Sequence, residues 1–372
     1  MNKILYVVST LKRSGPTNQL FNIIKNLDRS VFEPVLITLS PEPKDSRWQD
    51  YQSLGIAMHS LILSRLGGLF FAKSKLKKLI NDIKPDLIHT QGIRADVLIS
   101  QLNLNQPHVS TIHNFPQIDY KMTYGKFLSK FMVKNHTRVM HHIDRLIGCS
   151  ISVENNLKHS FGLTNTIAIQ NGVDQDFFYP KPKNECNLRA SLGIGVNDIV
   201  WISTGHLSEL KDPLFLIDAW TLMEEKHPNH HLVFLGSGSL ANECEMRVKN
   251  LKNVHLLGRV SNVLDFLHSS DFFISASQSE GLPMAAIEAM ACGLPLLVSD
   301  IEPYKEIFEL SDKVGQMYQL GSKKSFFESF SVLIGQDYSE SSKAAIKLVD
   351  EVLNAKTMSK GYQKIYNDLL EK

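Results

Sequence analysis

The chain has 372 residues, of which 43% are hydrophobic and 21% charged, with a formal net charge of +2 and four cysteines. This composition excludes collagen-like, disulfide-scaffolded and wholly disordered proteins, and the length predicts two globular units or slightly more. The apolar run at residues 61–72 is too short and too interrupted to span a membrane, and residues 4–8 are too few for a secretory signal. A cytoplasmic location is therefore expected. The widely spaced cysteines predict reduced thiols without a metal or redox motif; they are Cys149, Cys186, Cys244 and Cys292.

The small net charge conceals two halves of opposite sign. Residues 1–170 contain 21 Lys and Arg against 11 Asp and Glu, whereas residues 171–372 contain 19 against 27. A basic half favours anionic partners such as nucleic acid, phosphorylated ligands or acidic lipid. The alternative is solvated charge with no partner.

Short apolar runs alternate with amphipathic segments along the whole chain. In the first half, strands are predicted at residues 4–8, 34–38, 86–89, 109–112 and 145–148, with helices at 18–27 and 73–83. In the second half, strands are predicted at residues 199–203, 231–235, 254–257, 272–275 and 295–298, followed by one long helical pattern at 342–372. This repeated alternation predicts an α/β protein with two doubly wound domains. Gly, Pro, Asn and Asp accumulate at residues 171–197, where the seam is expected.

The densest pattern lies at residues 277–295, where a strand end and a polar loop lead into a helix expected at 283–292. Pro283 suits the first turn of that helix, and Gly293 suits its end. Glu280 precedes the helix, and a lone carboxylate there is usually only a favourable first-turn charge. Glu288 is harder to explain, because a carboxylate within an Ala-rich, apolar helix needs a partner. The free N–H groups of residues 281–284 are expected to face an anion.

The spacing of Glu280 and Glu288, with seven residues between them, resembles the E-x7-E signature of retaining glycosyltransferases of family 4. Further segments resemble the family in its order: Asn171–Asp174, a Gly205–Asp212 diphosphate loop, the G-x-G turn at Leu235–Gly238, and Leu257–Gly258. The resemblance implies a GT-B architecture, with two doubly wound Rossmann-like domains facing a central cleft. It places an acceptor-side domain at residues 1–178, a sugar-nucleotide domain at 179–352 and a helix at 353–372 that packs back on the first domain.

The resemblance also implies roles for individual residues. Glu280 would orient the donor sugar, Glu288 would bind the ribose, and His113 would orient the donor or the acceptor as a second catalytic residue. No cofactor and no obligatory metal are expected. The residues implied to bind the donor are Gly15, His206, Lys211, Gly236, Gly281, Leu282, Pro283, Met284 and Glu288.

Two positions depart from the family pattern. His206 replaces an arginine and carries a full positive charge only when protonated. Pro16 replaces a glycine in the N-terminal loop and has no N–H to offer a phosphate, so Gly15, Thr17 and the helix expected from about Thr17 remain as donors. These departures keep a catalytically silent sugar-nucleotide-binding protein open as an alternative, beside an epimerase or phosphorylase of the same fold.

Several other patterns have simpler explanations. Residues 236–241 fit a dinucleotide fingerprint but lack its acidic partner, and Asp174-Gln175-Asp176 is better explained as a turn than as a metal motif. His89 is expected to be a satisfied polar residue at a strand end. The segment Thr111-Ile112-His113-Asn114 resembles the family's T-x-H-[DN] pattern, which implies a functional role for His113.

A basic segment follows at residues 121–145, where Lys126, Lys130 and Lys134 recur at helical spacing among apolar residues. This pattern suits either a membrane surface or lipid phosphate, or an ordinary helix with its apolar stripe inside. Nucleic acid is not expected, because no binding motif accompanies the charge.

Family analogy implies transfer of a hexose or N-acetylhexosamine from a nucleotide-diphosphate sugar, with a UDP-sugar favoured over GDP-mannose. The implied acceptor is a glycan or an undecaprenyl-type lipid-linked glycan in bacterial O-antigen or capsule synthesis. The enzyme would then be cytoplasmic or peripheral at the inner face of the cell membrane.

Overall fold

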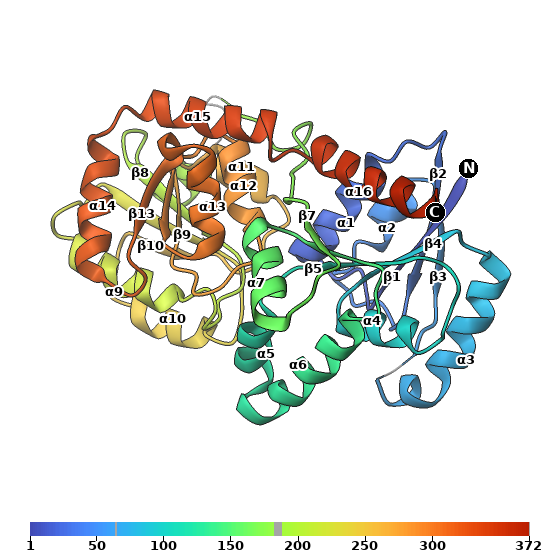
Figure 1. Cartoon of the computed structure of the whole chain (residues 1–372). Helices are drawn as coiled ribbons and strands as arrows, with labels where there is room; N and C mark the ends of the chain where they lie inside the picture. The colour runs from blue at the N-terminus through green and yellow to red at the C-terminus, as the bar shows by residue number, and fades with distance from the viewer. Residues whose placement is uncertain (64, 182–187, 372) are drawn as a thin grey trace. The chain divides into compact units, whose positions relative to one another are not determined.

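The computed structural model describes residues 1–63, 65–181 and 188–371. The chain forms two compact units (Figure 1): unit 1 comprises Met1–Gly172 and Ala355–Lys372, and unit 2 comprises Val173–Asn354. Residues 182–187 of the expected seam, which include Cys186, lie outside the described residues. The thiols of Cys149, Cys244 and Cys292 are buried, and none of them forms a disulfide within the described part of the chain.

Unit 1 contains a seven-stranded sheet in the order β3-β2-β1-β4-β5-β6-β7, with parallel pairing throughout. The predicted first-half strands are confirmed. The strands β3 and β7 were not predicted, because they are short and only partly buried and so lack a continuous apolar run. The strands are β1 (Asn2–Val8), β2 (Phe32–Thr38), β3 (Ala57–Ser60), β4 (Leu87–Gln91), β5 (His108–Ile112), β6 (Arg145–Gly148) and β7 (Thr166–Ala168).

Helices cover both faces of this sheet. Alternate residues of β1 point to opposite faces, so β1 contributes side chains to a core on each side. Tyr6 packs in a core with helices α1 and α16, whereas Leu5 packs in a second core with α3 and α4. The helices of unit 1 are α1 (Gly15–Lys25), α2 (Trp48–Gln52), α3 (Arg65–Ile83), α4 (Ile93–Ser100), α5 (Pro116–Tyr124), α6 (Lys126–Met140), α7 (Ile151–Phe161) and α16 (Ala355–Leu370).

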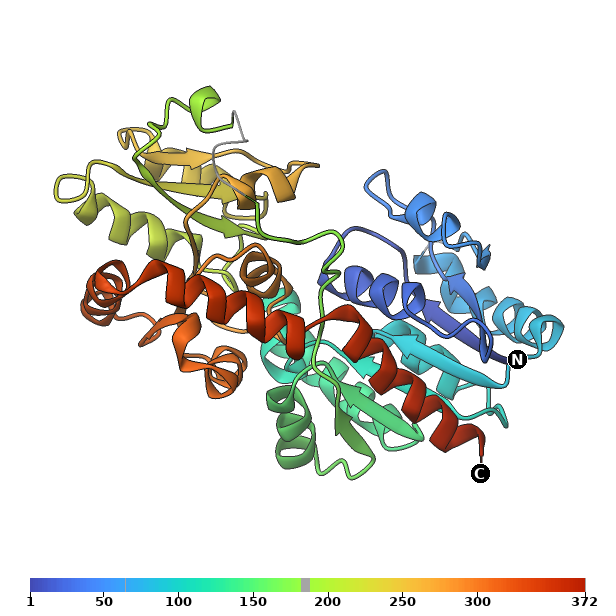
Figure 2. The ribbon, with the colours of Figure 1, turned by 90° about the horizontal axis from the view of Figure 1, so that it is seen from above.

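The helical pattern predicted at residues 342–372 is divided between two helices. Helix α15 (Tyr338–Glu351) belongs to unit 2 and ends before Asn354, whose Nδ2 donates to the Asp350 carbonyl over 2.9 Å. Helix α16 then runs alongside the sheet of unit 1 to the C-terminus (Figure 2). It is anchored by Tyr366, whose hydroxyl lies 2.7 Å from His89 Nδ1, and by Tyr362, which accepts from Gln19 Nε2 over 2.7 Å.

Unit 2 contains a six-stranded parallel sheet in the order β10-β9-β8-β11-β12-β13. Its core is aromatic: Trp201 stacks on Phe272 at 4.4 Å and meets Trp220 edge-on at 6.2 Å. The strands are β8 (Ile199–Thr204), β9 (His230–Leu235), β10 (Val254–Leu256), β11 (Phe272–Ser275), β12 (Leu296–Ser299) and β13 (Gly315–Tyr318). The other elements are α8 (Leu188–Ser191), α9 (Pro213–Met223), α10 (Ala241–Val248), α11 (Val263–His268), α12 (Met284–Ala291), α13 (Glu302–Leu310), η2 (Asp312–Val314), α14 (Lys323–Gly335) and α15.

Each sheet reverses its strand order once. In unit 1 this topological switch point lies between β1 and β4, and in unit 2 it lies between β8 and β11. In open parallel sheets, ligands bind outside the carboxyl ends of the strands at such a point. Among the described residues, every helix is too short or too polar to cross a bilayer.

Two buried histidines, His89 and His108, and the partly buried His113 make the stability of unit 1 dependent on pH. Burial lowers the pKa of His89 to about 3 and that of His113 to about 4, and it also lowers the pKa of His108. The unfolded chain protonates these rings below about pH 6.5, whereas the folded chain resists protonation. The free energy of unfolding should therefore fall as the pH drops from about 6.5 toward 4. Urea midpoints measured across this window test the prediction, and His89→Gln should flatten the slope; an equal slope in both proteins would contradict it.

Candidate active site

Two loops meet at the switch point of unit 2, one after β8 and one after β11. The Gln278 N–H donates to the Leu210 carbonyl over 2.8 Å, and Gln278 Nε2 donates to Asp212 Oδ2 over 3.1 Å. Asp212 also accepts from the Phe215 N–H and so caps helix α9. The two loops are therefore held together at the edge where an open α/β sheet binds its ligand.

The central interaction of this site is an ion pair between Lys211 Nζ and Glu280 Oε1. The side chain of Glu280 is 11% exposed and that of Lys211 is 31% exposed. Ser277 Oγ donates to the same Glu280 oxygen over 2.7 Å. The carboxylate is therefore oriented by two partners, while the ammonium group keeps part of its surface open to a ligand.

A buried layer of hydroxyl groups lies beneath Glu280. Ser299 Oγ donates to the Ser277 carbonyl over 2.6 Å, and the Tyr318 hydroxyl donates to the Ser275 carbonyl over 2.9 Å. Burial raises the pKa of the Tyr304 hydroxyl, and the nearby Glu280 charge raises it further. Sequence reasoning did not identify Ser299, Tyr304 or Tyr318, because they come from later elements and carry no local motif.

Helix α12 begins at Met284, one residue later than expected, and Pro283 is its N-cap. Leu282 and Met284 are buried, whereas Gly281 and Glu288 are partly exposed. The predicted helix end is confirmed, because Gly293 follows the C-cap with a φ of +83°.

His206 has a defined tautomer at this site. Its Nδ1 lies 3.0 Å from the Ser237 carbonyl oxygen, which only accepts, so Nδ1 carries the hydrogen. The neutral ring then presents Nε2 as an acceptor, and only the protonated ring presents a donor there. The arginine that the family pattern has at this position is always a donor, so the replacement changes the chemistry of the phosphate contact.

Two glycines bring the loop after β9 close to the loop after β8. A Cβ atom at Gly236 would lie 1.7 Å from the Gly205 carbonyl oxygen, and one at Gly238 would lie 2.2 Å from the Leu207 carbonyl oxygen. Gly236 also has a φ of +145°, which other residues rarely adopt. The G-x-G turn is therefore required by the approach of two backbones.

Replacing Gly236 with alanine should destabilise unit 2 by about 3 kcal/mol or more, because the clash involves backbone atoms that cannot turn away. Gly335→Ala is the matched control, since nothing lies within 4 Å of a Cβ at that position. Thermal unfolding of both variants tests this. Equal midpoints for the two variants would contradict the packing argument.

In unit 1, the loop after β1 carries Gly15 at the start of helix α1. This helix begins at Gly15, two residues earlier than Thr17, with Ser14 as its N-cap. The Ser14 N–H donates to Thr17 Oγ1 over 3.0 Å, while the Ser14 side chain accepts from the Thr17 backbone in a capping box. The Thr17 N–H, expected from sequence to be open to a phosphate, is therefore already bonded, and the first turn of α1 offers fewer donors than expected.

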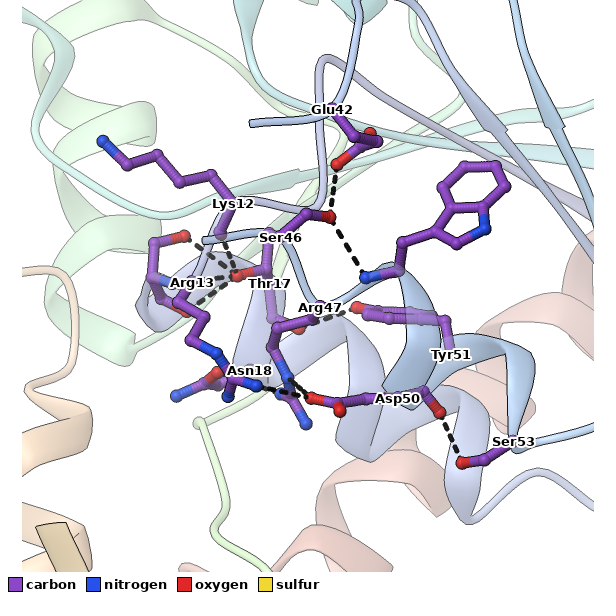
Figure 3. A network of polar contacts seen from close by, with 12 residues as sticks. Lys12, Arg13, Thr17, Asn18, Glu42, Ser46, Arg47, Asp50, Tyr51 and Ser53 are labelled. Atoms are coloured by element: carbon purple, nitrogen blue, oxygen red, sulfur yellow. Dashed lines mark hydrogen bonds and ion pairs between the residues drawn. The ribbon is translucent and has the colours of Figure 1, made fainter. Parts of the chain in front are cut away.

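A polar network ties the start of α1 to α2 and to Arg47, the N-cap of α2 (Figure 3). The guanidinium of Arg47 bonds Asp50 and Asn18, both over 2.9 Å, and lies 4.1 Å from the centre of the Phe21 ring. The Tyr51 hydroxyl donates to the Thr17 carbonyl over 2.7 Å. The first turns of α1, which begins at Gly15, are therefore held against α2.

His113 follows β5 directly and has an unusual environment. Its Nε2 is buried and has no hydrogen-bond partner among the residues that the structure describes. Burial lowers its pKa to about 4, so the ring is neutral near neutral pH. A neutral ring with an unpaired nitrogen is available to a ligand hydroxyl group.

Two of the simpler sequence interpretations are confirmed. His89 is fully buried, and its ring nitrogens lie 2.7 Å from the Tyr366 hydroxyl and 2.8 Å from Thr111 Oγ1, so it is a satisfied core residue. Residues 174–176 form a turn in which the Asp176 N–H donates to Asp174 Oδ1.

Comparison with known families accounts for both units. The family described as "Glycosyltransferase Family 4" matches residues 13–177, and "Glycosyl transferases group 1" matches residues 185–334. The chain belongs to glycosyltransferase family 4. The two matches together include Gly15 and His113 in unit 1 and the loops that carry Lys211 and Glu280 in unit 2.

This member of family 4 has curated relatives of modest identity. An uncharacterized glycosyltransferase of Methanocaldococcus jannaschii is 29% identical over 66% of this chain and 64% of its own length. The UDP-Gal:alpha-D-GlcNAc-diphosphoundecaprenol alpha-1,3-galactosyltransferase of Escherichia coli is 31% identical over 61% of this chain and 60% of its own length. The matches thus span less than two thirds of these two relatives. The O-antigen biosynthesis glycosyltransferase WclY of Escherichia coli is 25% identical over 82% of each chain.

Solved structures confirm the GT-B fold of this glycosyltransferase, with its two parallel Rossmann-like sheets. HepE of Anabaena, solved in complex with UDP and glucose, aligns with a TM-score of 0.82 at 18% identity over 99% of this chain and 100% of that one. At this identity the comparison shows the fold alone.

Proposed function

We propose that this family 4 enzyme transfers a hexose or N-acetylhexosamine from a UDP-sugar to a lipid-linked glycan, with retention of configuration. The observation that carries the proposal is the Lys211–Glu280 pair at the switch point of unit 2. The Escherichia coli galactosyltransferase, whose name gives UDP-Gal as donor and a diphosphoundecaprenol-linked acceptor, supports the donor and acceptor classes. The relation to WclY supports a role in surface polysaccharide assembly.

The diphosphate is the leaving group, so negative charge grows on it as the glycosidic bond breaks. Lys211 supplies a point charge beside it, and the N–H groups from Gly281 to Met284 supply aligned dipoles at the start of α12. These groups are in place before the reaction, because Gln278 ties their loops together. The proposal requires no metal, since Lys211 and the helix end supply the positive potential.

The two glutamates bind the sugar and the ribose of the donor. Glu280 accepts from the hydroxyl groups of the sugar, and in the absence of donor it is held in position by Ser277 and Lys211. Glu288, on the partly exposed side of α12, accepts from the ribose hydroxyl groups.

Retention follows if the acceptor hydroxyl attacks the anomeric carbon on the face from which the diphosphate departs. The new C–O bond then forms as the C–O bond to the phosphate breaks, and the acceptor proton passes to the departing phosphate oxygen. His113 orients a donor or acceptor hydroxyl through its unpaired Nε2. At a pKa of about 4 the ring is neutral and accepts a hydrogen bond without a competing charge.

Substitution of the ion pair tests the proposal most directly. Glu280→Gln and Lys211→Met should each lower kcat by about 10²–10³-fold, because each removes a group that acts on the developing charge or on the sugar. Lys313→Met and Glu340→Gln, which break an exposed ion pair in the same unit, are the matched controls and should leave kcat unchanged. Full activity in both site variants, with a UDP-sugar and a lipid-linked acceptor, would refute the assignment.

His113→Ala should lower kcat for transfer while leaving the affinity for UDP unchanged. The reason is that His113 belongs to unit 1, whereas the residues proposed to hold the diphosphate belong to unit 2. Isothermal titration with UDP and initial rates separate the two effects. A parallel loss of UDP affinity would place His113 in nucleotide binding instead.

The reaction products distinguish a glycosyltransferase from the alternative functions. An epimerase converts the UDP-sugar without acceptor, a phosphorylase requires inorganic phosphate, and a silent binding protein shifts in thermal stability with UDP but makes no product. Binding at 100 times the Kd raises stability by about 2.7 kcal/mol, which a thermal-shift measurement resolves.

A further inference from the structure

Helices α5 and α6 form a hairpin that projects from unit 1, with their connecting turn at its outer end (Figure 1). Three large apolar side chains near this turn face solvent: Phe127 is 90% exposed, Phe131 is 70% exposed and Leu128 is 53% exposed. The two phenylalanines are four residues apart and share one face of α6. This excludes the ordinary alternative, in which these apolar residues form the stripe facing the core.

The same hairpin is strongly basic. Residues 116–140, which form the hairpin, contain five Lys and Arg against one acidic residue, Asp119. The five side chains are exposed, and no ion pair engages them within the described residues; they are Lys121, Lys126, Lys130, Lys134 and Arg138. By contrast, Lys158 of α7 pairs with Glu154 of the same helix over 2.7 Å.

The base of the hairpin is rigid. The Tyr120 hydroxyl lies 2.9 Å from His136 Nδ1, and His136 Nε2 lies 2.8 Å from Asp96 Oδ2 on α4. Burial acts to raise the pKa of Asp96, but hydrogen bonds from His136 and Thr90 outweigh it and keep the pKa low. The exposed phenylalanines are therefore presented on a fixed element.

We propose that the α5–α6 hairpin binds the surface of an anionic lipid bilayer. Phe127, Leu128 and Phe131 enter the boundary between headgroups and acyl chains, and the lysines pair with the anionic headgroups. Charge complementarity favours this occupant over a second copy of the chain, because two such hairpins would repel each other. The apolar cluster, in turn, favours a bilayer over a purely ionic partner.

The position of the hairpin next to His113 indicates a function for its membrane-binding surface. His113 and the start of α5 at Pro116 are separated by two residues, so the membrane-binding element continues directly from the segment proposed to orient the acceptor. A lipid-linked acceptor would keep its chain in the bilayer while its glycan reaches His113. Binding to vesicles does not itself require the proposed transfer, so the two proposals fail separately.

Co-sedimentation with vesicles tests the inference. The full chain should bind equimolar phosphatidylglycerol–phosphatidylcholine vesicles at low salt, release with rising NaCl, and not bind phosphatidylcholine alone. The triple substitution of Lys126, Lys130 and Lys134 by Gln should weaken binding about one hundredfold. Substitution of Lys323, Lys324 and Lys347, which are exposed lysines of unit 2, should change nothing.

The phenylalanines are tested independently of charge. The double variant Phe127→Ala/Phe131→Ala should weaken binding by at least about tenfold, whereas Leu222→Ala/Met246→Ala, at exposed apolar sites of unit 2, should have no effect. Phe131→Trp should shift its fluorescence to the blue when anionic vesicles are added, which reports insertion and not loss of fold.

Three results would overturn the inference. The first is absence of binding to anionic vesicles at low salt. The second is equal binding of the hairpin variants and their controls. The third is a dimer in lipid-free solution that Phe127→Ala/Phe131→Ala dissociates, because the apolar patch would then be covered by a second copy.

Discussion

The parallel pairing of both sheets is the constraint on which the rest of this protein depends. Because every strand in a sheet points the same way, all the loops that follow the strands gather at one edge. Lys211 and Glu280 are 69 residues apart in sequence, yet they meet because β8 and β11 are neighbours at the point where the strand order reverses. The ion pair is thus a consequence of topology.

The environment of the Lys211–Glu280 pair suits ligand binding more than it suits stabilisation of the fold. A pair that is partly exposed contributes little to folding, since water screens it and solvation opposes its burial. Ser277, with the buried hydroxyl groups beneath it, holds the Glu280 carboxylate in position. A neutral side chain would pack equally well there. In unit 1, the opposite solution is found at Asp96, where a buried carboxylate receives several hydrogen bonds and serves as an anchor for the α5–α6 hairpin.

Sequence periodicity predicted the buried central strands, since these are continuous apolar runs, but not β3, β7 or β13, which are short and partly exposed. The helix boundaries were displaced by local capping, as at Ser14, where a capping box starts α1 before its apolar pattern begins. Of the candidate site, the motif residues Glu280, Lys211 and Gly236 were predictable from their spacing. The supporting Ser299 and Tyr318 were not, because their contribution depends on contacts between distant elements.

The sequence by itself determined the α/β class, the two-unit organisation, the family resemblance and the basic character of the α5–α6 segment. Only the tertiary structure decided which atoms are engaged and which are open. It bonds His206 Nδ1 to Ser237 and leaves Nε2 of His113 unpaired among the described residues. It also turns Phe127 and Phe131 to solvent. The physical reason is that periodicity records which residues share a face, whereas the face that is buried depends on what packs against it.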